Sequence, residues 1–230
     1  MPFLIQNKDL ATADRVQLLI SYFLQLVLVF MSIFFLLRQE WLSAFLSLGI
    51  LLLTLLPALL RRSYNVFLPV EFEVLTVVLL FASLFLGEIH AYYTKFWWWD
   101  IVLHTTSAAL LGMLGFILVY VLNKERRINL FMTPGFIALF SFAFSLALGV
   151  AWEIFEFAMD SFFGLHMQKS GLVDTMWDLI VDVLGAAVIA IVGYFSLKHE
   201  PRSFLFRHLL RRFVQKNPQL FRKRRKWIRL

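Results

Sequence analysis

Residues 174–193 have the sequence DTMWDLIVDVLGAAVIAIVG. Residues four apart lie on one face of an α-helix, so Asp174, Asp178 and Asp182 form an acidic stripe in the first half of this segment. Small residues continue roughly the same stripe in the second half, at Gly185, Ala186, Ala190 and Gly193. The rest of the segment is apolar and long enough to cross a hydrocarbon core, which takes roughly 20 helical residues. The segment therefore predicts a membrane-spanning helix with a face that is ionisable at one end and small at the other.

Two further apolar segments have the same design. In the segment 100–122, Asp100 and His104 share a face that continues through Ala108, Gly112 and Gly115. In the segment 133–157 the order is reversed, and small residues lead to acids: Ser141, Ser145, Gly149, Glu153, Glu156 and, beyond it, Asp160. Small residues at four-residue spacing let helices approach closely in lipid. We therefore expect the three faces to pack together, with acids and imidazole forming a pocket at one end.

The composition predicts an all-α polytopic membrane protein. The 230 residues are 60% hydrophobic and only 16% charged, a balance that a soluble domain of this size does not carry. Only helices satisfy their own backbone in lipid without closing a barrel. Six transmembrane helices are expected, near 16–37, 41–60, 70–87, 100–122, 133–157 and 176–197. They make a membrane domain over residues 1–197, followed by a tail over 198–230. The chain has no cysteine, which excludes disulfides and thiolate ligands.

Lysine and arginine predict the orientation in the membrane. They concentrate in the N-terminal arm, in the second and fourth loops, and in the tail. Basic residues favour the cytoplasmic side. Both termini are therefore expected in the cytoplasm, and the acid–histidine cluster at the outer face.

The tail predicts a basic amphipathic helix that ends near Pro218. Its apolar residues recur at helical spacing, at Phe206, Leu209, Leu210, Phe213 and Val214. The basic residues expected at the membrane surface are Arg207, Arg211, Arg212, Arg222, Lys223, Arg224, Arg225 and Lys226. Such a helix is typical of attachment to anionic lipids. A protein partner or nucleic acid is the less favoured alternative.

The acidic cluster predicts a divalent metal site. Several carboxylates a few ångströms apart cannot all stay ionised without cations, so one or more would otherwise be protonated. Lys95 and Lys169 are too few to neutralise them. Carboxylates and imidazole suit Zn²⁺, Mn²⁺, Mg²⁺ or Ca²⁺, and the low histidine count favours a mostly oxygen shell. The expected ligands are Asp100, His104, Glu153, Asp178 and Asp182.

Other residues near the cluster are interpreted as general bases, as an aromatic belt, or as residues without a functional role. Glu156 is the first choice for a general base and Glu88 the second. An aromatic run is expected to form a belt at the outer interface, with a platform for stacking a sugar or lipid as the alternative, at Trp97, Trp98 and Trp99. Asp174 is interpreted as a helix cap, and Asp160 and His166 as loop residues.

Three motifs resemble a known family. They are Trp99-Asp100-x3-His104 with Gly112 and Gly115, Trp152-Glu153-x2-Glu156-x3-Asp160, and Asp174-x3-Asp178-x3-Asp182-x2-Gly185-Ala186. Together they resemble the YjdF-like family of uncharacterised bacterial inner-membrane proteins, over about the third to sixth helices. The Asp-x3-His pair alone is also similar to VanZ-like proteins. The resemblance implies a multi-pass protein of the bacterial inner (plasma) membrane and supplies no established activity.

The favoured function is therefore a metal-dependent enzyme that acts at the outer leaflet on a lipid or lipid-linked substrate, by hydrolysis or group transfer. A cation- or proton-coupled transporter or channel is an alternative. It is less favoured because the inner halves of the three helices are small and apolar. A second alternative is structural, with a metal that braces the helices and a tail that binds a partner.

Overall fold

The computed structural model describes residues 12–55, 59, 63, 67–124, 132–164, 166–198 and 204–218, and all its regular elements within these residues are helices. In chain order they are α1 (Thr12–Leu37), α2 (Trp41–Thr54), α4 (Val70–Leu80), the π-helix η2 (Phe81–Ile89), α5 (Tyr92–Lys95), α6 (Trp99–Lys124), α7 (Pro134–Phe163), α8 (Leu172–Lys198) and α9 (Phe204–Lys216). The predicted all-helical fold is confirmed for this part of the chain.

Five helical stretches are long and apolar enough to cross a membrane. They are Leu18–Leu37, Val70–Gly87, Trp99–Asn123, Pro134–Phe163 and Leu172–Lys198. The apolar part of α2, Ser43–Thr54, is shorter. The expected second span reaches residue 60, and 56–58 and 60 lie outside the described residues. The expected second span, and with it a total of six spans, therefore stays a prediction.

The helix α7 extends further than expected, to Phe163 instead of residue 157. No proline or glycine occurs between residue 157 and Gly164, which ends the helix in the left-handed conformation at φ 65°. Asp160 consequently lies in the last turn of a helix, and its interpretation as a loop residue is wrong.

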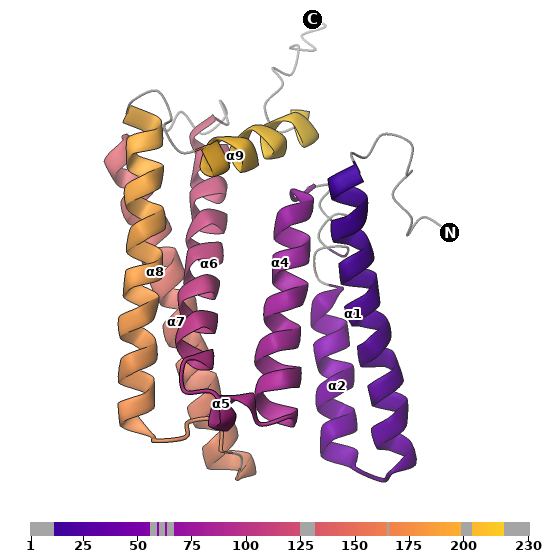
Figure 1. Ribbon diagram of the computed structural model, residues 1–230. Helices are drawn as coiled ribbons and strands as arrows, with labels where there is room; N and C mark the ends of the chain where they lie inside the picture. Colours follow the sequence, from indigo (N-terminus) through magenta and orange to yellow (C-terminus); the bar gives the residue numbers. More distant parts are fainter. Residues whose placement is uncertain are drawn as a thin grey trace, which may run out of the picture.

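The helices α6, α7 and α8 pack against one another as a three-helix unit, and α1 packs mainly with α2 and α4 (Figure 1). Small residues make the contact within the three-helix unit. The Ser141 hydroxyl donates to the Gly112 carbonyl at 2.6 Å, and the Ser145 hydroxyl donates to the Ala108 carbonyl at 2.7 Å. A Cβ on Gly185 would lie 2.6 Å from the Thr105 carbonyl oxygen of α6. The backbones therefore approach as closely as these residues permit.

The π-helix η2 holds α5 and the start of α6 in place. The indole N–H of Trp99 donates to the Ala82 carbonyl at 3.3 Å, and the Tyr93 hydroxyl donates to Ser83 at 3.0 Å. The Tyr93 ring also fills the space that a Cβ on Gly87 would occupy. π-Helical turns are frequent at functional sites. Here the turn positions Tyr93 and Trp99, which frame the end of the bundle that carries the acids.

The helix α9 lies across the opposite end of the bundle, where α1 begins and α8 ends (Figure 1). Phe213 is only 2% exposed and packs in a core cluster with Phe72 and Met113. The Asn217 side chain bonds to both the N–H and the carbonyl of Phe67, at 2.7 Å each. The apolar face of α9 is thus covered at least partly by protein, which its amphipathic pattern alone does not reveal.

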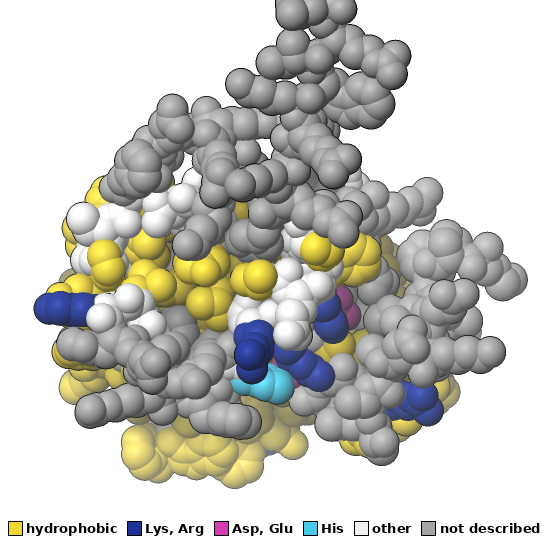
Figure 2. Space-filling view, turned by 90° about the horizontal axis from the view of Figure 1, so that it is seen from above, with side chains coloured by type: hydrophobic (Ala, Val, Ile, Leu, Met, Phe, Trp, Pro, Cys, Tyr) yellow, Lys and Arg dark blue, Asp and Glu magenta, His cyan; other side chains and the backbone are white. Residues whose placement is uncertain are grey.

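Arg212, which is predicted to lie at the membrane surface, forms an ion pair with Glu71 of α4. Arg211 is exposed. The side chain of Arg207 and the whole run 222–226 lie outside the described residues. Figure 2 shows lysine and arginine side chains on this end of the molecule.

Candidate metal centre

The centre of the candidate site is the imidazole of His104, which contacts carboxylates through both ring nitrogens. The atom Nε2 lies 3.6 Å from Oδ1 of Asp100, 3.9 Å from Oε1 of Glu153 and 4.0 Å from Oδ1 of Asp178. The atom Nδ1 lies 3.4 Å from Oδ1 of Asp182. The structure therefore divides the acids into three on one side of the ring and one on the other.

These side chains come from three helices and are largely buried. Asp100 precedes His104 by one turn of α6, whereas Glu153 belongs to α7, and Asp178 and Asp182 to α8. All but Asp100 are less than 9% exposed. Ionisable groups at such positions in a membrane helix are costly unless they have partners or a function. The small-residue contacts in the other half of the same helices bring the acidic halves together.

The donor atoms on the Nε2 side have the spacing of a metal site. One ligand atom each from Asp100, His104 and Asp178 can be chosen so that all lie within 4.8 Å of one another. Ligands at about 2.0–2.4 Å from a common ion are separated by roughly 3–4.8 Å. These three residues and their spacing therefore fit a divalent ion bound at Nε2.

Glu153 supplies an independent indication of a cation at this place. Its side chain is 4% exposed, and neither carboxylate oxygen has a hydrogen-bond partner among the described residues. The Thr175 hydroxyl approaches Glu153 without reaching hydrogen-bonding geometry. A buried carboxylate without a hydrogen bond is strongly disfavoured, and a cation beside Nε2 of His104 would compensate its charge.

The position of Asp182 favours a different role from the predicted one. It contacts Nδ1, the ring nitrogen opposite the three grouped carboxylates. Its carboxylate occupies the space next to Gly149, where a Cβ would clash with Oδ2. Metal-bound histidines commonly donate their second N–H to a carboxylate, which orients the ring. Asp182 therefore fits an orienting partner of His104 better than a direct ligand.

Sequence reasoning counted Lys169 among the nearby cations but missed its direct contact with Asp100. Its Nζ lies 2.9 Å from Oδ2 of Asp100 and 3.7 Å from the ring centroid of Tyr93. Its backbone N–H donates to Oδ2 of Asp174 at 3.1 Å. The signal available in the sequence was that Lys169 is the only lysine or arginine in the short connection between two acid-bearing helices. It places a positive charge at the edge of the acidic cluster.

The remaining predicted residues have mostly structural positions. Asp160 accepts the N–H groups of Met167 and Gln168 at 2.7 and 2.8 Å, and so braces the connection between α7 and α8. Asp174 lies in the first turn of α8 and not at its cap, because the helix begins earlier than expected, at Leu172. His166 is an exposed loop residue, as predicted.

Of the two predicted general bases, the structure describes the side chain of Glu156 but not that of Glu88. Glu156 is buried on α7, almost one turn beyond Glu153 and on the same side of the helix. Glu88 falls in η2, and its side chain lies outside the described residues. In the aromatic run, Trp97 is 82% exposed and Trp98 is 41% exposed, whereas Trp99 is tied to η2.

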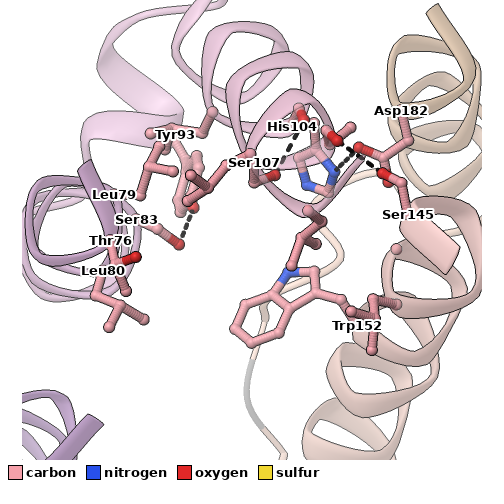
Figure 3. A pocket seen from close by; sticks show the side chains of 16 residues that line it. Thr76, Leu79, Leu80, Ser83, Tyr93, His104, Ser107, Ser145, Trp152 and Asp182 are labelled. Atoms are coloured by element: carbon pink, nitrogen blue, oxygen red, sulfur yellow. Dashed lines mark hydrogen bonds and ion pairs between the residues drawn. The ribbon is translucent and has the colours of Figure 1, made fainter. Parts of the chain in front are cut away.

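A cavity of about 250 Å³ gives access to the imidazole. His104 and Asp182 form part of its wall, which is otherwise mainly apolar. Figure 3 shows these two side chains on one side of the cavity and Tyr93 and Ser83 on the other. The lining includes residues of α4, η2, α5, α6, α7 and α8. The cluster is therefore buried from water but adjoins a space that can hold part of an apolar molecule.

The fold and the cluster define a polytopic helical membrane protein with a buried acid–histidine site. The chain belongs to the family of predicted membrane proteins called DUF2238, which it matches over residues 17–199. This match includes α1 and α2, and so covers more of the chain than the third to sixth helices that carry the YjdF-like resemblance.

A related sequence comes from Thermotoga maritima. This uncharacterised protein is 32% identical over 123 residues, which are 52% of this chain and 62% of the relative. The match thus spans less than two thirds of the relative's length. No solved structure matches the chain.

Proposed function

We propose that this protein is a metal-dependent membrane enzyme that acts on a lipid or lipid-linked substrate, by hydrolysis or group transfer. The observation that carries the proposal is the arrangement around His104. Three carboxylates from three helices converge on Nε2, and a fourth lies against Nδ1. A cluster that served only for helix contact would not need an imidazole with every ring nitrogen beside an acid.

Each residue of the cluster has a distinct part in this proposal. His104, Asp100, Asp178 and Glu153 bind the ion, and Asp182 orients the imidazole. A bound divalent ion polarises a phosphoryl or carbonyl group or activates water. Glu156, buried beside Glu153, serves as the general base. Zn²⁺, Mn²⁺, Mg²⁺ and Ca²⁺ all suit this donor set, and the excess of oxygen ligands favours the harder ions.

The lipid-like nature of the substrate is supported by the cavity beside His104. Leucines of α4 and α6 and the indole of Trp152 line it. An apolar wall with a few polar groups at one point is typical of small-molecule sites. Trp97 and Trp98 are exposed at the same end of the bundle, where amphipathic aromatic rings hold a protein at the membrane interface.

We also propose the finer topology. The protein crosses the bacterial inner membrane six times with both termini in the cytoplasm, and the resemblance to YjdF-like proteins supports only the multi-pass inner-membrane part of this proposal. Support comes from α1 beginning and α8 ending at the same end of the bundle, and from the basic residues of α9 there (Figures 1 and 2). The metal centre then faces outward, and the basic tail meets anionic lipids of the inner leaflet.

A structural metal brace is the second candidate, because the cluster joins α6, α7 and α8. Transport has less support. Within the described residues, the half of the unit away from the acids is closed by the Ser141 and Ser145 contacts and by buried apolar side chains such as Phe116. An ion path through that half would need polar groups across the full depth.

Elemental analysis of the purified protein tests the metal. The wild type is expected to retain close to one equivalent of a divalent ion after mild purification. Asp178→Ala and Glu153→Ala are expected to retain much less, whereas Asp160→Asn, which changes an acid outside the cluster, keeps it. A metal-free wild type would contradict the proposal, and the cluster would then be a set of carboxylates that share protons.

Glu156→Gln distinguishes an enzyme from a metal brace. Metal-loaded wild type is incubated with a total bacterial lipid extract, and mass spectrometry follows the lipids that are consumed. The enzyme proposal expects wild-type consumption of a lipid and at least about 100-fold slower consumption by Glu156→Gln at unchanged metal content. No lipid conversion by the wild type at full metal content would favour the brace.

A further inference from the structure

A second cavity, of about 480 Å³, lies at the same end of the bundle as the metal centre. Its apolar wall comes from α2 and η2 on one side and α7 on the other, with residues such as Leu46, Leu84 and Met159. Phe45 and Phe155 line the cavity and are also exposed on the surface, at 72% and 44%. The cavity therefore opens toward the side of the bundle, where lipid would surround the helices.

One lysine places a positive charge at the wall of this cavity. Lys169 lines it, together with the loop residue His166. The ammonium group of Lys169 rests against Tyr93 and bonds to Oδ2 of Asp100, and Oδ1 of the same carboxylate lies 3.6 Å from Nε2 of His104. A group bound at Lys169 is thus separated from the proposed metal position by a single side chain.

We propose that this second cavity holds the hydrocarbon chain of an anionic amphiphile, whose phosphate-like headgroup binds Lys169 and faces the metal centre. The proposal rests on the proposed function and deepens it by naming the charge and the binding place of the substrate. Neutral lipids would leave the lysine unused, whereas an anion complements it.

The two cavities share a wall that connects the amphiphile to His104. Tyr93 and Trp152 line both cavities, and His104 and Asp182 line only the first. A headgroup at Lys169 therefore lies beside the Tyr93–Trp152 wall, with the imidazole just beyond it. The hydrocarbon chain would extend between α2 and η2 on one side and α7 on the other, while the headgroup remains at the outer end of the bundle.

The arrangement also predicts that metal and anion help each other to bind. In the absence of an ion, the positive charge of Lys169 is neutralised by Asp100. A cation on Oδ1 of Asp100 compensates that carboxylate, which leaves the ammonium charge available, and a lysine ammonium has three N–H donors. The headgroup would then bind both positive charges, and each ligand would strengthen the other by the same factor.

The test measures the binding of decyl phosphate, at a known mole fraction in dodecyl maltoside micelles, to the full-length metal-loaded protein. Decyl glucoside, which has the chain without the charge, and inorganic phosphate, which has the charge without the chain, are the matched probes. Decyl phosphate is expected to bind at least tenfold more tightly than either. Its affinity is expected to fall at least fivefold when the metal is removed.

Three variants assign this affinity to the cavity. Lys169→Ala is expected to weaken decyl phosphate at least tenfold, and Lys95→Ala, which removes an exposed lysine near the same end, leaves it unchanged. Gly49→Leu fills the cavity from α2, where a Cβ would meet nothing within 4 Å. It is expected to weaken decyl phosphate and spare inorganic phosphate.

Two results would overturn the inference while leaving the metal centre intact. One is equal binding of decyl phosphate and decyl glucoside to a protein that holds its metal. The other is full affinity of Lys169→Ala and Gly49→Leu for decyl phosphate. Metal content, measured on the same samples, separates these results from a failure of the proposed function, which is marked by a wild type without metal.

Discussion

In one half of the α6–α7–α8 unit the helices meet through glycine, alanine and serine. In the other half the same faces carry the imidazole of His104 and several carboxylates, among them Asp100, Glu153, Glu156, Asp178 and Asp182. Both halves use residues three or four apart, so both belong to one continuous stripe on each helix. The small half brings the backbones into contact, as the 2.6 Å bond from Ser141 to Gly112 illustrates. The acidic half is then held at short distances that its like charges would oppose.

In the proposed function, the half with small residues positions the helices, and the acidic half supplies the chemistry. Substitutions in the acidic half should therefore weaken metal binding with little change in stability. Substitutions in the half with small residues, called the packing half below, should lower stability with little change in metal binding.

The largest effect is expected for His104→Ala. It removes the imidazole, and with it the contacts that the ring makes to all four carboxylates. Metal affinity should fall more than about 100-fold, beyond the 10–100-fold typical of a lost outer partner. Equilibrium dialysis measures this. The matched control His166→Ala changes an exposed loop histidine, and an equal loss in that variant would contradict the account.

Gly185→Ala tests the packing half by adding a methyl group to the contact between α8 and α6. Its Cβ would lie 2.6 Å from the backbone oxygen of Thr105, which cannot rotate away as a side chain can. The expected loss of stability is about 1–3 kcal/mol, visible as a lower midpoint of thermal unfolding in detergent.

Gly49→Ala is the control for that loss. This glycine also lies within a helix, but its new Cβ would meet nothing within 4 Å, so the midpoint should stay or rise slightly. Equal midpoints for the two variants would show that the α6–α8 contact is not as tight as described.

Gly149→Ala tests the boundary between the halves. The added methyl would occupy the place of the Asp182 carboxylate and displace it from Nδ1 of His104. Metal affinity is expected to fall about tenfold, the smaller end of the range for an orienting partner. Gly135→Ala, at the open start of the same helix, should have no effect. Unchanged affinity in Gly149→Ala would remove Asp182 from the site.

The smallest effect is expected for Ser145→Ala. It removes one buried hydrogen bond to the Ala108 carbonyl. Interhelical hydrogen bonds in membranes average about 0.6 kcal/mol, so the unfolding midpoint should fall only slightly and metal affinity should not change. A fall in metal affinity would show that Ser145, which also lines the first cavity, belongs to the chemical half.

Helical spacing alone predicted much of the three-helix unit. Asp178, Asp182 and Gly185 lie on one stripe because a helix repeats every 3.6 residues, and the structure buries all three. The same reasoning cannot tell which ring nitrogen of His104 each acid contacts, because that depends on rotamers and on the relative depth of three helices. Their roles as ligands remain predictions.

Other features depend on contacts that no local pattern encodes. Lys169 reaches Asp100 from a loop 69 residues away, so spacing carries no information about the pair. The π-helical turn of η2 arises in a stretch that is mostly apolar, like its neighbours. The docking of Phe213 onto the bundle is equally invisible, because an amphipathic helix presents the same pattern to lipid and to protein.

The central claim is an ion bound to Nε2 of His104 and to carboxylates of three helices. X-ray absorption spectroscopy, at the edge of the metal identified by elemental analysis, tests it most directly. The account predicts one imidazole nitrogen and two or three carboxylate oxygens, at about 2.0–2.4 Å, with the nitrogen signal absent in His104→Ala. A bound metal with an oxygen-only shell, or a nitrogen signal that survives in His104→Ala, would contradict it.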